Sequence, residues 1–412
     1  MLLAGAGGLA LLLWFVRRSR PDLRIGIPIA VAFGLRILAA SGLGQTNIAP
    51  ELRGGDETTF LFRGQAVAGE PLFGSDSLDK LISQLHTFLI SIHHRVLDVT
   101  VPENMLRFEM ITFAVIGLLL LSAAVYELAG PRAALIAAWV LALEPTHVFF
   151  SGLIHKEPLM FMAEGLVAFG GAVLWQRGKL VALVPLVLGC LVAVSTRPYV
   201  GWFLAAAAAA VVLHASLTRQ RGLRSLALGA TVVLLVAAFI PVVWEASSDE
   251  ELRELQQSQD ANAADTEANL SLERVDYSTR ENLILNMPER VYDVIFKPYV
   301  WQAENTSQQL GILGTLVVLT CLVLLSQALW RNRSAVMQRA GPLIYPGAFM
   351  LAAYSLSAGN AGTSFRYRSH IVALALCLVI VLREHRQATQ RAAAPTYRRA
   401  VPQPAPMRQP IA

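Results

Sequence analysis

Long apolar segments recur along the chain and alternate with polar connections of very different lengths. Each apolar segment is close to the ~20 residues that an α-helix needs to cross a bilayer. The pattern predicts an all-α, polytopic transmembrane bundle with about 11 spans. We expect these spans at residues 2–16, 25–43, 108–128, 133–150, 158–175, 180–195, 200–216, 225–244, 309–330, 342–358 and 370–382.

Composition supports a membrane protein and argues against a nucleic-acid partner. Hydrophobic residues make up 55% of the 412-residue chain and charged residues 15%, whereas soluble domains carry about 25% charged residues. The net charge is +5, but no basic stripe interleaves with aromatic residues as nucleic-acid binding requires. The excess of Lys and Arg is therefore interpreted as a topology signal.

Positive charge clusters in every second connection, which sets a predicted orientation because cytoplasmic connections are rich in Lys and Arg. The basic connections follow residues 16, 128, 175, 216 and 330. The first span has no basic residue before it and three Arg residues soon after it, so we expect it uncleaved with its N-terminus outside. We predict a transmembrane catalytic domain at 1–382 and a disordered, basic cytoplasmic tail at 383–412.

Two long connections, 44–107 and 245–308, are expected to face away from the cytoplasm. Apolar positions between residues 78 and 96 follow helical spacing, and Asp76 or Ser77 is a candidate cap. This predicts an amphipathic helix lying in the membrane interface. In the second connection, 247–280 is acidic and expected to be mobile, whereas 283–301 is apolar and aromatic and is expected to form a helix that dips into the outer leaflet.

An acidic pair, Asp56 and Glu57, follows the second predicted span and opens the first outer loop. Adjacent carboxylates at a loop start are either solvated or placed to cap a helix dipole. Just outside a bilayer they also suit a general base that takes a proton from an acceptor hydroxyl. The sequence does not decide between these interpretations.

Four basic residues occupy short outer connections, where Lys and Arg are normally avoided. Lys156, Arg197, Arg366 and Arg368 each either extend to the membrane interface without a ligand or bind an anion. Four on one membrane face favour an anion site, because guanidinium and ammonium groups both bind phosphate. A phosphate at this position is a lipid phosphate or a lipid-linked sugar phosphate. The full set of expected substrate-binding residues is His155, Lys156, Glu157, Arg197, Tyr199, Arg366, Tyr367 and Arg368.

Glu157 has three possible roles: the acidic start of a helix, favoured because Pro158 follows it, an ion-pair partner of Lys156, or a second acid-base group. Two further charges, Arg36 and Glu144, lie inside predicted spans. Each follows a predicted cytoplasmic Arg by twelve residues, which is about 18 Å along a helix that rises 1.5 Å per residue. Equal depth and opposite sign predict that they pair, as a structural or a catalytic ion pair.

No cofactor or metal is expected. Cys190, Cys321 and Cys377 all fall inside apolar spans. The His residues on the outer side lack the spacing that joins ligands on one helix.

The stretch Asp56-Glu57-Thr58-Thr59-Phe60, with the small residues and Gly69 after it, resembles the acidic first-loop motif of the GT-C superfamily of membrane glycosyltransferases. That superfamily includes protein O-mannosyltransferases and aminoarabinose transferases. Phe60 stands where the family has Tyr. The late segment Arg366-Tyr367-Arg368-Ser369-His370 resembles a second family motif, with His370 in place of Pro.

The resemblance implies a GT-C-like fold with interfacial helices in the outer loops and an inverting, metal-independent glycosyl transfer. The donor would be a polyprenyl-phosphate-linked sugar and the acceptor a glycan, lipid or protein. Asp56 would be the base, and the basic residues would receive the departing lipid phosphate. The expected location is the outer face of a bacterial plasma membrane, in cell-envelope polysaccharide assembly. Alternatives are an O-antigen-type polymerase or ligase, a transporter or flippase, and a non-catalytic assembly partner.

Overall fold

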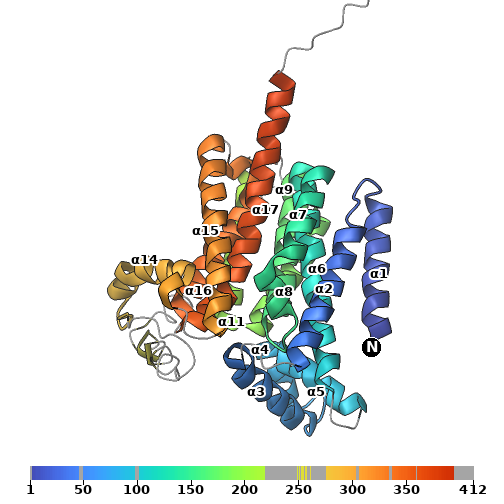
Figure 1. The fold of residues 1–412 in the computed structure, drawn as a ribbon, viewed down its shortest axis with the longest axis vertical. Helices are drawn as coiled ribbons and strands as arrows, with labels where there is room; N and C mark the ends of the chain where they lie inside the picture. Colours follow the sequence, from blue (N-terminus) through green and yellow to red (C-terminus); the bar gives the residue numbers. More distant parts are fainter. Residues whose placement is uncertain are drawn as a thin grey trace, which may run out of the picture.

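The fold is a bundle of long helices with shorter helices gathered at one end (Figure 1). It is seen in a computed structural model of the chain, whose described residues contain no β-strand. The structure describes residues 2–45, 50–97, 102–218, 248, 250, 252–254, 256–257, 260, 275–302, 306–333, 336–358 and 360–393. The predicted all-α class is therefore confirmed for this part of the chain.

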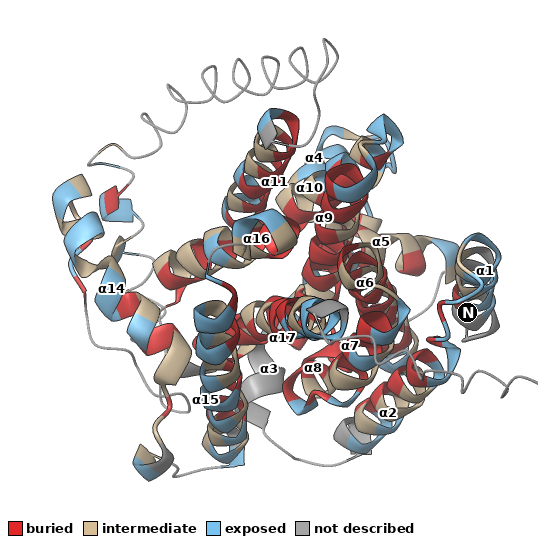
Figure 2. Ribbon diagram, turned by 90° about the horizontal axis from the view of Figure 1, so that it is seen from above, coloured by how far each residue is buried: buried red, intermediate tan, exposed pale blue. Residues whose placement is uncertain are grey.

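The centre of the bundle is formed by α6 (Glu103–Ala129) and α9 (Glu157–Arg177), which pack closely along their lengths. A side-chain carbon on Gly117 would lie 2.7 Å from the carbonyl oxygen of Phe161, and one on Gly165 would lie 2.7 Å from that of Gly117. Small residues allow such backbone contact between membrane helices. Buried residues concentrate on α6, α9 and α17 (Ala361–Ala393), as Figure 2 shows.

Five described helices are long and apolar enough to cross a membrane. They are α6, α9 and much of α11 (Pro198–Thr218), α15 (Thr306–Asn332) and α17. A sixth is added if α7 (Pro131–Leu143) and α8 (Pro145–Ser151) form one span bent by 62° at Glu144. A helical membrane protein is therefore supported, whereas a count of eleven crossings is not.

Each predicted apolar segment that the structure describes nevertheless lies in helical structure. The remaining ones correspond to α1 (Leu2–Ser19), α2 (Gly26–Gln45), η1 (Leu180–Ala182) followed by α10 (Leu183–Thr196), and α16 (Val336–Ser357). Residues 225–244 lie outside the described part of the chain. The difference in count arises because hydropathy detects apolar helices, and several of these are short or bent.

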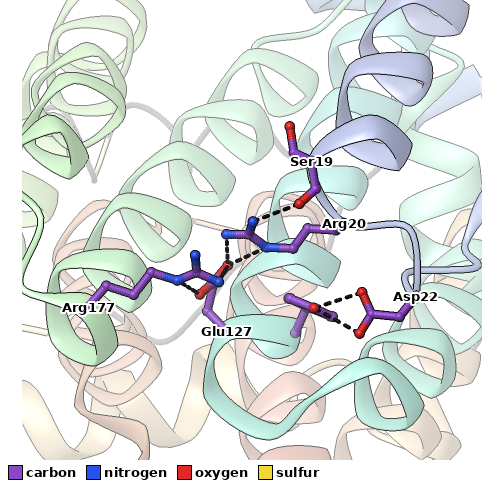
Figure 3. A network of polar contacts seen from close by, with 6 residues as sticks. Ser19, Arg20, Asp22, Glu127 and Arg177 are labelled. Carbon is purple, nitrogen blue, oxygen red and sulfur yellow. Dashed lines mark hydrogen bonds and ion pairs between the residues drawn. The ribbon is translucent and has the colours of Figure 1, made fainter.

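Connections predicted to share one side of the membrane do meet. Arg20, after α1, and Arg177, at the end of α9, both donate to Glu127 near the end of α6, at 2.9 Å and 2.6 Å (Figure 3). Tyr126 donates to Asp22 beside them. This cluster ties three helix ends together, which agrees with the alternating charge pattern of the sequence.

The connection 44–107 is mostly helical, and two expectations about it were wrong. Asp56 and Glu57 lie inside α3 (Pro50–Ala68) instead of at a loop start. The single amphipathic helix expected over 78–96 is two helices, α4 (Ser75–Ser83) and α5 (Leu85–Leu97), which separate at Gln84. Arg95 donates to the Val67 carbonyl at 2.5 Å and to Ser77 Oγ at 2.9 Å, and so joins all three helices.

Two further expectations concern the second outer connection and the tail. The acidic stretch 247–280 lies mostly outside the described residues. A helix does form in the apolar part, as α14 (Arg280–Phe296), followed by η2 (Val300–Gln302). The tail expected to be disordered from 383 begins as helix, because α17 continues to Ala393 and projects from the end of the bundle opposite α3–α5 (Figure 1). Its Glu, Gln, Arg and Ala residues are good helix formers.

The contact between α6 and α9 leads to a stability prediction. Gly117→Ala places a methyl group against a backbone carbonyl that cannot move aside, and we expect a loss of about 1–3 kcal/mol. Gly34→Ala in α2 is the matched control, since nothing lies within 4 Å of its added carbon. Thermal unfolding of the purified protein in detergent should fall for the first variant only. If both variants unfold at the same temperature, the close approach of α6 to α9 is contradicted.

Candidate functional site

Three connections that are far apart in the sequence meet at the α3–α5 end of the bundle. They are the α8–α9 turn with His155 and Lys156, the α10–α11 junction at Arg197, and the first turns of α17 with Arg366. Glu157 is the first residue of α9 and Pro158 follows it, which confirms the predicted helix start. Pro is favoured there because the missing N–H would have no helical partner.

Glu157 is the centre of this arrangement. Arg197 Nη2 donates to Glu157 Oε1 at 2.6 Å, and His155 Nδ1 lies 3.6 Å from Glu157 Oε2. Arg366 Nη1 lies 3.3 Å from the same His155 nitrogen. Glu157 and Arg197 are buried, with side chains 3% and 8% exposed. We call His155, Glu157, Arg197 and Arg366 the Glu157 cluster.

Tyrosines extend the Glu157 cluster toward α11, α16 and α17. The guanidinium of Arg197 lies 4.6 Å from the ring centre of Tyr367, a cation–π contact. The hydroxyls of Tyr199 and Tyr367 are 3.2 Å apart, and Tyr354 stacks on Tyr367 with ring centres separated by 4.5 Å. The structure thus brings together seven of the eight predicted binding residues when Lys156 is included.

Lys156 connects the Glu157 cluster to α3 and α5. Its ammonium lies 5.5 Å from the ring centre of Phe60, and the Phe60 ring meets His86 edge-on at 4.6 Å. His86 is fully buried, and neither ring nitrogen has a hydrogen-bond partner. Burial, followed by the charges of Lys156 and His155, lowers the pKa of His86 to about 3. The imidazole is therefore neutral at physiological pH.

Glu57 is buried and hydrogen-bonded, which rules out the solvated interpretation considered from the sequence. Its Oε1 accepts from the Ile154 backbone N–H at 2.8 Å, and its Oε2 accepts from Arg107 at 3.0 Å. Both side chains are nearly buried, so Glu57 holds α3 against α6 and the α8–α9 turn. Asp56 lies beside it in α3, but its side chain is outside the described part of the chain.

Arg368 is the predicted binding residue that does not join the Glu157 cluster. It is buried and donates to the carbonyls of Ile295, Lys297 and Gly311 at 3.0–3.1 Å. It also donates to Thr315 Oγ1 at 3.1 Å. These bonds use the guanidinium to fix the end of α14 to α15. The sequence grouped Arg368 with Arg366 because both lie in the same short predicted outer connection, yet residues two apart do not face each other on a helix.

Arg36 and Glu144 interact through their charges, but each has its own direct partners. Arg36 donates to the carbonyls of Leu141 and Ala142 at the end of α7, and to Ser151 Oγ at 3.3 Å. Glu144 caps α8 by accepting from the backbone N–H groups of residues 146 and 147. Together they satisfy the backbone groups that the bend between α7 and α8 leaves open.

A buried pair deeper in the bundle was missed by sequence reasoning. Glu164 of α9 and His370 of α17 are fully buried, with Oε1 and Nδ1 2.7 Å apart, although without hydrogen-bond geometry. Glu164 lies inside the predicted span 158–175. A charged residue within a span is the same feature that singled out Arg36 and Glu144, so the sequence could have pointed to it. Arg107 was missed because it lies just before the predicted span 108–128, outside the apolar segment, where a basic residue is not unusual.

Within the described part of the chain, no three His, Cys, Asp or Glu side chains are grouped so that they could hold a metal ion. Comparisons of the chain with family models, with curated proteins and with solved structures found no match. The proposal for function therefore draws on the site and on the motifs in the sequence.

The two carboxylates on Arg107 give a matched test of the role of Glu57. Glu57→Ala leaves a buried guanidinium without its buried partner, and we expect a loss of about 3–5 kcal/mol in unfolding free energy. Glu103 also accepts from Arg107, but its side chain is 59% exposed, so Glu103→Ala should cost at most about 1 kcal/mol. Thermal unfolding in detergent measures both. If Glu103→Ala proves as costly as Glu57→Ala, Glu57 is not the anchor described above.

Proposed function

We propose that this chain is a membrane glycosyltransferase, with the eleven-span GT-C-like architecture that the sequence resembles. It moves a sugar from a polyprenyl-phosphate donor to a glycan, lipid or protein acceptor at the outer face of a bacterial plasma membrane, in cell-envelope polysaccharide assembly. The observation that carries the proposal is the meeting of Lys156, Arg197 and Arg366 at one end of the bundle, around a single carboxylate.

The charge balance of this site favours an anionic ligand. Arg197 is occupied by Glu157 at 2.6 Å. Lys156 and Arg366 are both partly exposed, so a ligand at this end of the bundle could contact them. Two cations at the end of a membrane bundle suit the phosphate of a lipid whose chain stays in the bilayer, because charge-assisted hydrogen bonds to phosphate are among the stronger protein contacts.

Asp56 is the proposed base, and the packing of α3 supports this role. Its neighbour Glu57 accepts from the Ile154 backbone, and Phe60, one turn further along, contacts Lys156. The backbone of α3 is therefore held beside the basic residues. A carboxylate at this level suits removal of a proton from an acceptor hydroxyl.

The reaction would proceed in one displacement. The acceptor oxygen attacks the anomeric carbon while its proton passes to Asp56, and the bond from that carbon to the phosphate oxygen breaks. The lipid phosphate leaves with the electron pair of the broken bond. Lys156 and Arg366 stabilise the negative charge that grows on it, and Arg197 keeps Glu157 from competing for them.

A transporter or flippase is the second candidate, and one observation favours it. Glu164 and His370 form a fully buried titratable pair among membrane helices. Ionisable groups within such helices often mark a pathway for protons or substrates. A transporter would move lipid-linked sugar without cleaving it, which separates the two candidates.

The test supplies the purified full-length chain in proteoliposomes with a panel of labelled polyprenyl-phosphate sugars and of glycan, lipid and protein acceptors, and measures release of free polyprenyl phosphate. We expect wild-type turnover and losses of about 10²–10³-fold for Arg366→Ala and about 10²–10⁴-fold for Asp56→Asn. Arg63→Ala, an exposed Arg on the same helix as Asp56, is the control and should stay within about twofold.

Three outcomes would contradict the enzyme. They are the absence of release with every donor and acceptor supplied, full activity of Asp56→Asn, and movement of intact donor between leaflets without release. The last would favour the flippase.

A further inference from the structure

Helix α14 exposes several large apolar side chains and buries two of its charges, although Glu281 and Glu289 are also exposed. Ile284 and Leu285 are 72% and 67% exposed, whereas Arg290 and Asp293 are 2% and 3% exposed. Pro288 and Tyr292, one and two turns beyond Ile284, are also exposed. A helix normally buries its apolar stripe and exposes its charges. Exposed apolar and aromatic side chains grouped along one face of a helix favour contact with an apolar medium.

The buried charges of α14 are neutralised within the protein. Lys297 Nζ lies 2.9 Å from Asp293 Oδ1, and Arg290 lies 3.9 Å from Asp293 and over the ring of Tyr277 at 6.0 Å. Arg368 also holds the end of the helix by donating to the Ile295 and Lys297 carbonyls. The side of α14 that carries Arg290 and Asp293 therefore faces the bundle, and these contacts hold the helix in that orientation.

The outward side of α14 is hollowed as well as apolar. Leu283, Ile284, Met287, Pro288 and Val291 line an open groove of about 460 Å³. None of these five side chains carries a charge or a hydrogen-bonding group. Such a groove offers nothing to a polar ligand, but it accommodates hydrocarbon chains.

The helix lies across the direction of the long helices, as Figures 1 and 2 both show. It is followed by η2, where Trp301 is 81% exposed, and then by the start of α15. The outward face of α15 is also apolar, with Leu313, Leu316 and Val323 at 53%, 48% and 57% exposure. An exposed Trp at the end of an apolar span is typical of the membrane–water boundary.

From these observations we propose that α14 lies in the membrane interface and that its outward face, Ile284, Leu285, Pro288 and Tyr292, contacts bilayer lipid. Lipid is favoured over a protein partner because the apolar face of α14 leads to the apolar face of a spanning helix. The exposed charges on α14 are Glu281 and Glu289. Insertion is therefore hydrophobic and needs no anionic headgroups, unlike that of basic interfacial helices.

The test measures the environment of single nitroxide labels in the full-length chain, with its three native Cys replaced by Ala, reconstituted in phosphatidylcholine vesicles. Labels at positions 284 and 285 are compared with one at Val323, which should face lipid, and one at Asp79 in α4, which should face water. We expect positions 284 and 285 to follow Val323, with high access to oxygen and low access to a water-soluble nickel complex. Adding phosphatidylglycerol should not change this.

Two results would overturn the proposal. If positions 284 and 285 follow Asp79, the face is in water; if both reagents are excluded, protein covers it. If the cysteine-free chain does not fold, the chain with its native cysteines is reconstituted in brominated lipid, and quenching of its tryptophan fluorescence is measured instead. Trp301→Phe should then remove a measurable part of the tryptophan quenching, and no change would count against the proposal. Neither measurement depends on turnover, so failure here leaves the proposed enzyme activity untouched.

Discussion

A single buried carboxylate organises the end of the bundle where the candidate site lies. Glu157 begins α9, accepts from Arg197 at the α10–α11 junction and lies beside His155, which in turn contacts Arg366 of α17. A buried charge is tolerated only when it is paired and hydrogen-bonded. The pairing therefore obliges three separate connections to come together, and the aromatic packing of Tyr367, Tyr199 and Tyr354 builds on that meeting.

Much of this arrangement followed from local sequence properties. Apolar length located the helices, and the alternation of basic connections grouped their ends correctly, as the contacts of Glu127 with Arg20 and Arg177 show. Short outer connections with unexpected Lys and Arg pointed to His155, Lys156, Arg197 and Arg366. The structure places these four residues at one end of the bundle. Position along the helix axis could be inferred because it follows from where each apolar segment begins and ends.

The remaining features depend on tertiary contacts that a single sequence does not show. Glu57 and Asp56 are adjacent and chemically alike, yet the partner that buries Glu57 is Arg107, fifty positions away. Arg368 is two residues from Arg366 but satisfies backbone carbonyls of a different segment. The break at Gln84 interrupts a regular apolar pattern: α5 packs mainly against α3, whereas α4 packs against α10 and α5.

The glycine contact between α6 and α9 makes one side of the bundle more closely packed than the other. The backbones of α6 and α9 approach so closely at Gly117 and Gly165 that neither helix can rotate against the other without a clash. On the other side, α15 is buried over only 28% of its spanning window and is fastened at its start through Arg368. Among the five candidate spans that the structure describes, α15 is therefore the least enclosed by protein, whereas α6 and α9 form the most closely packed pair of helices.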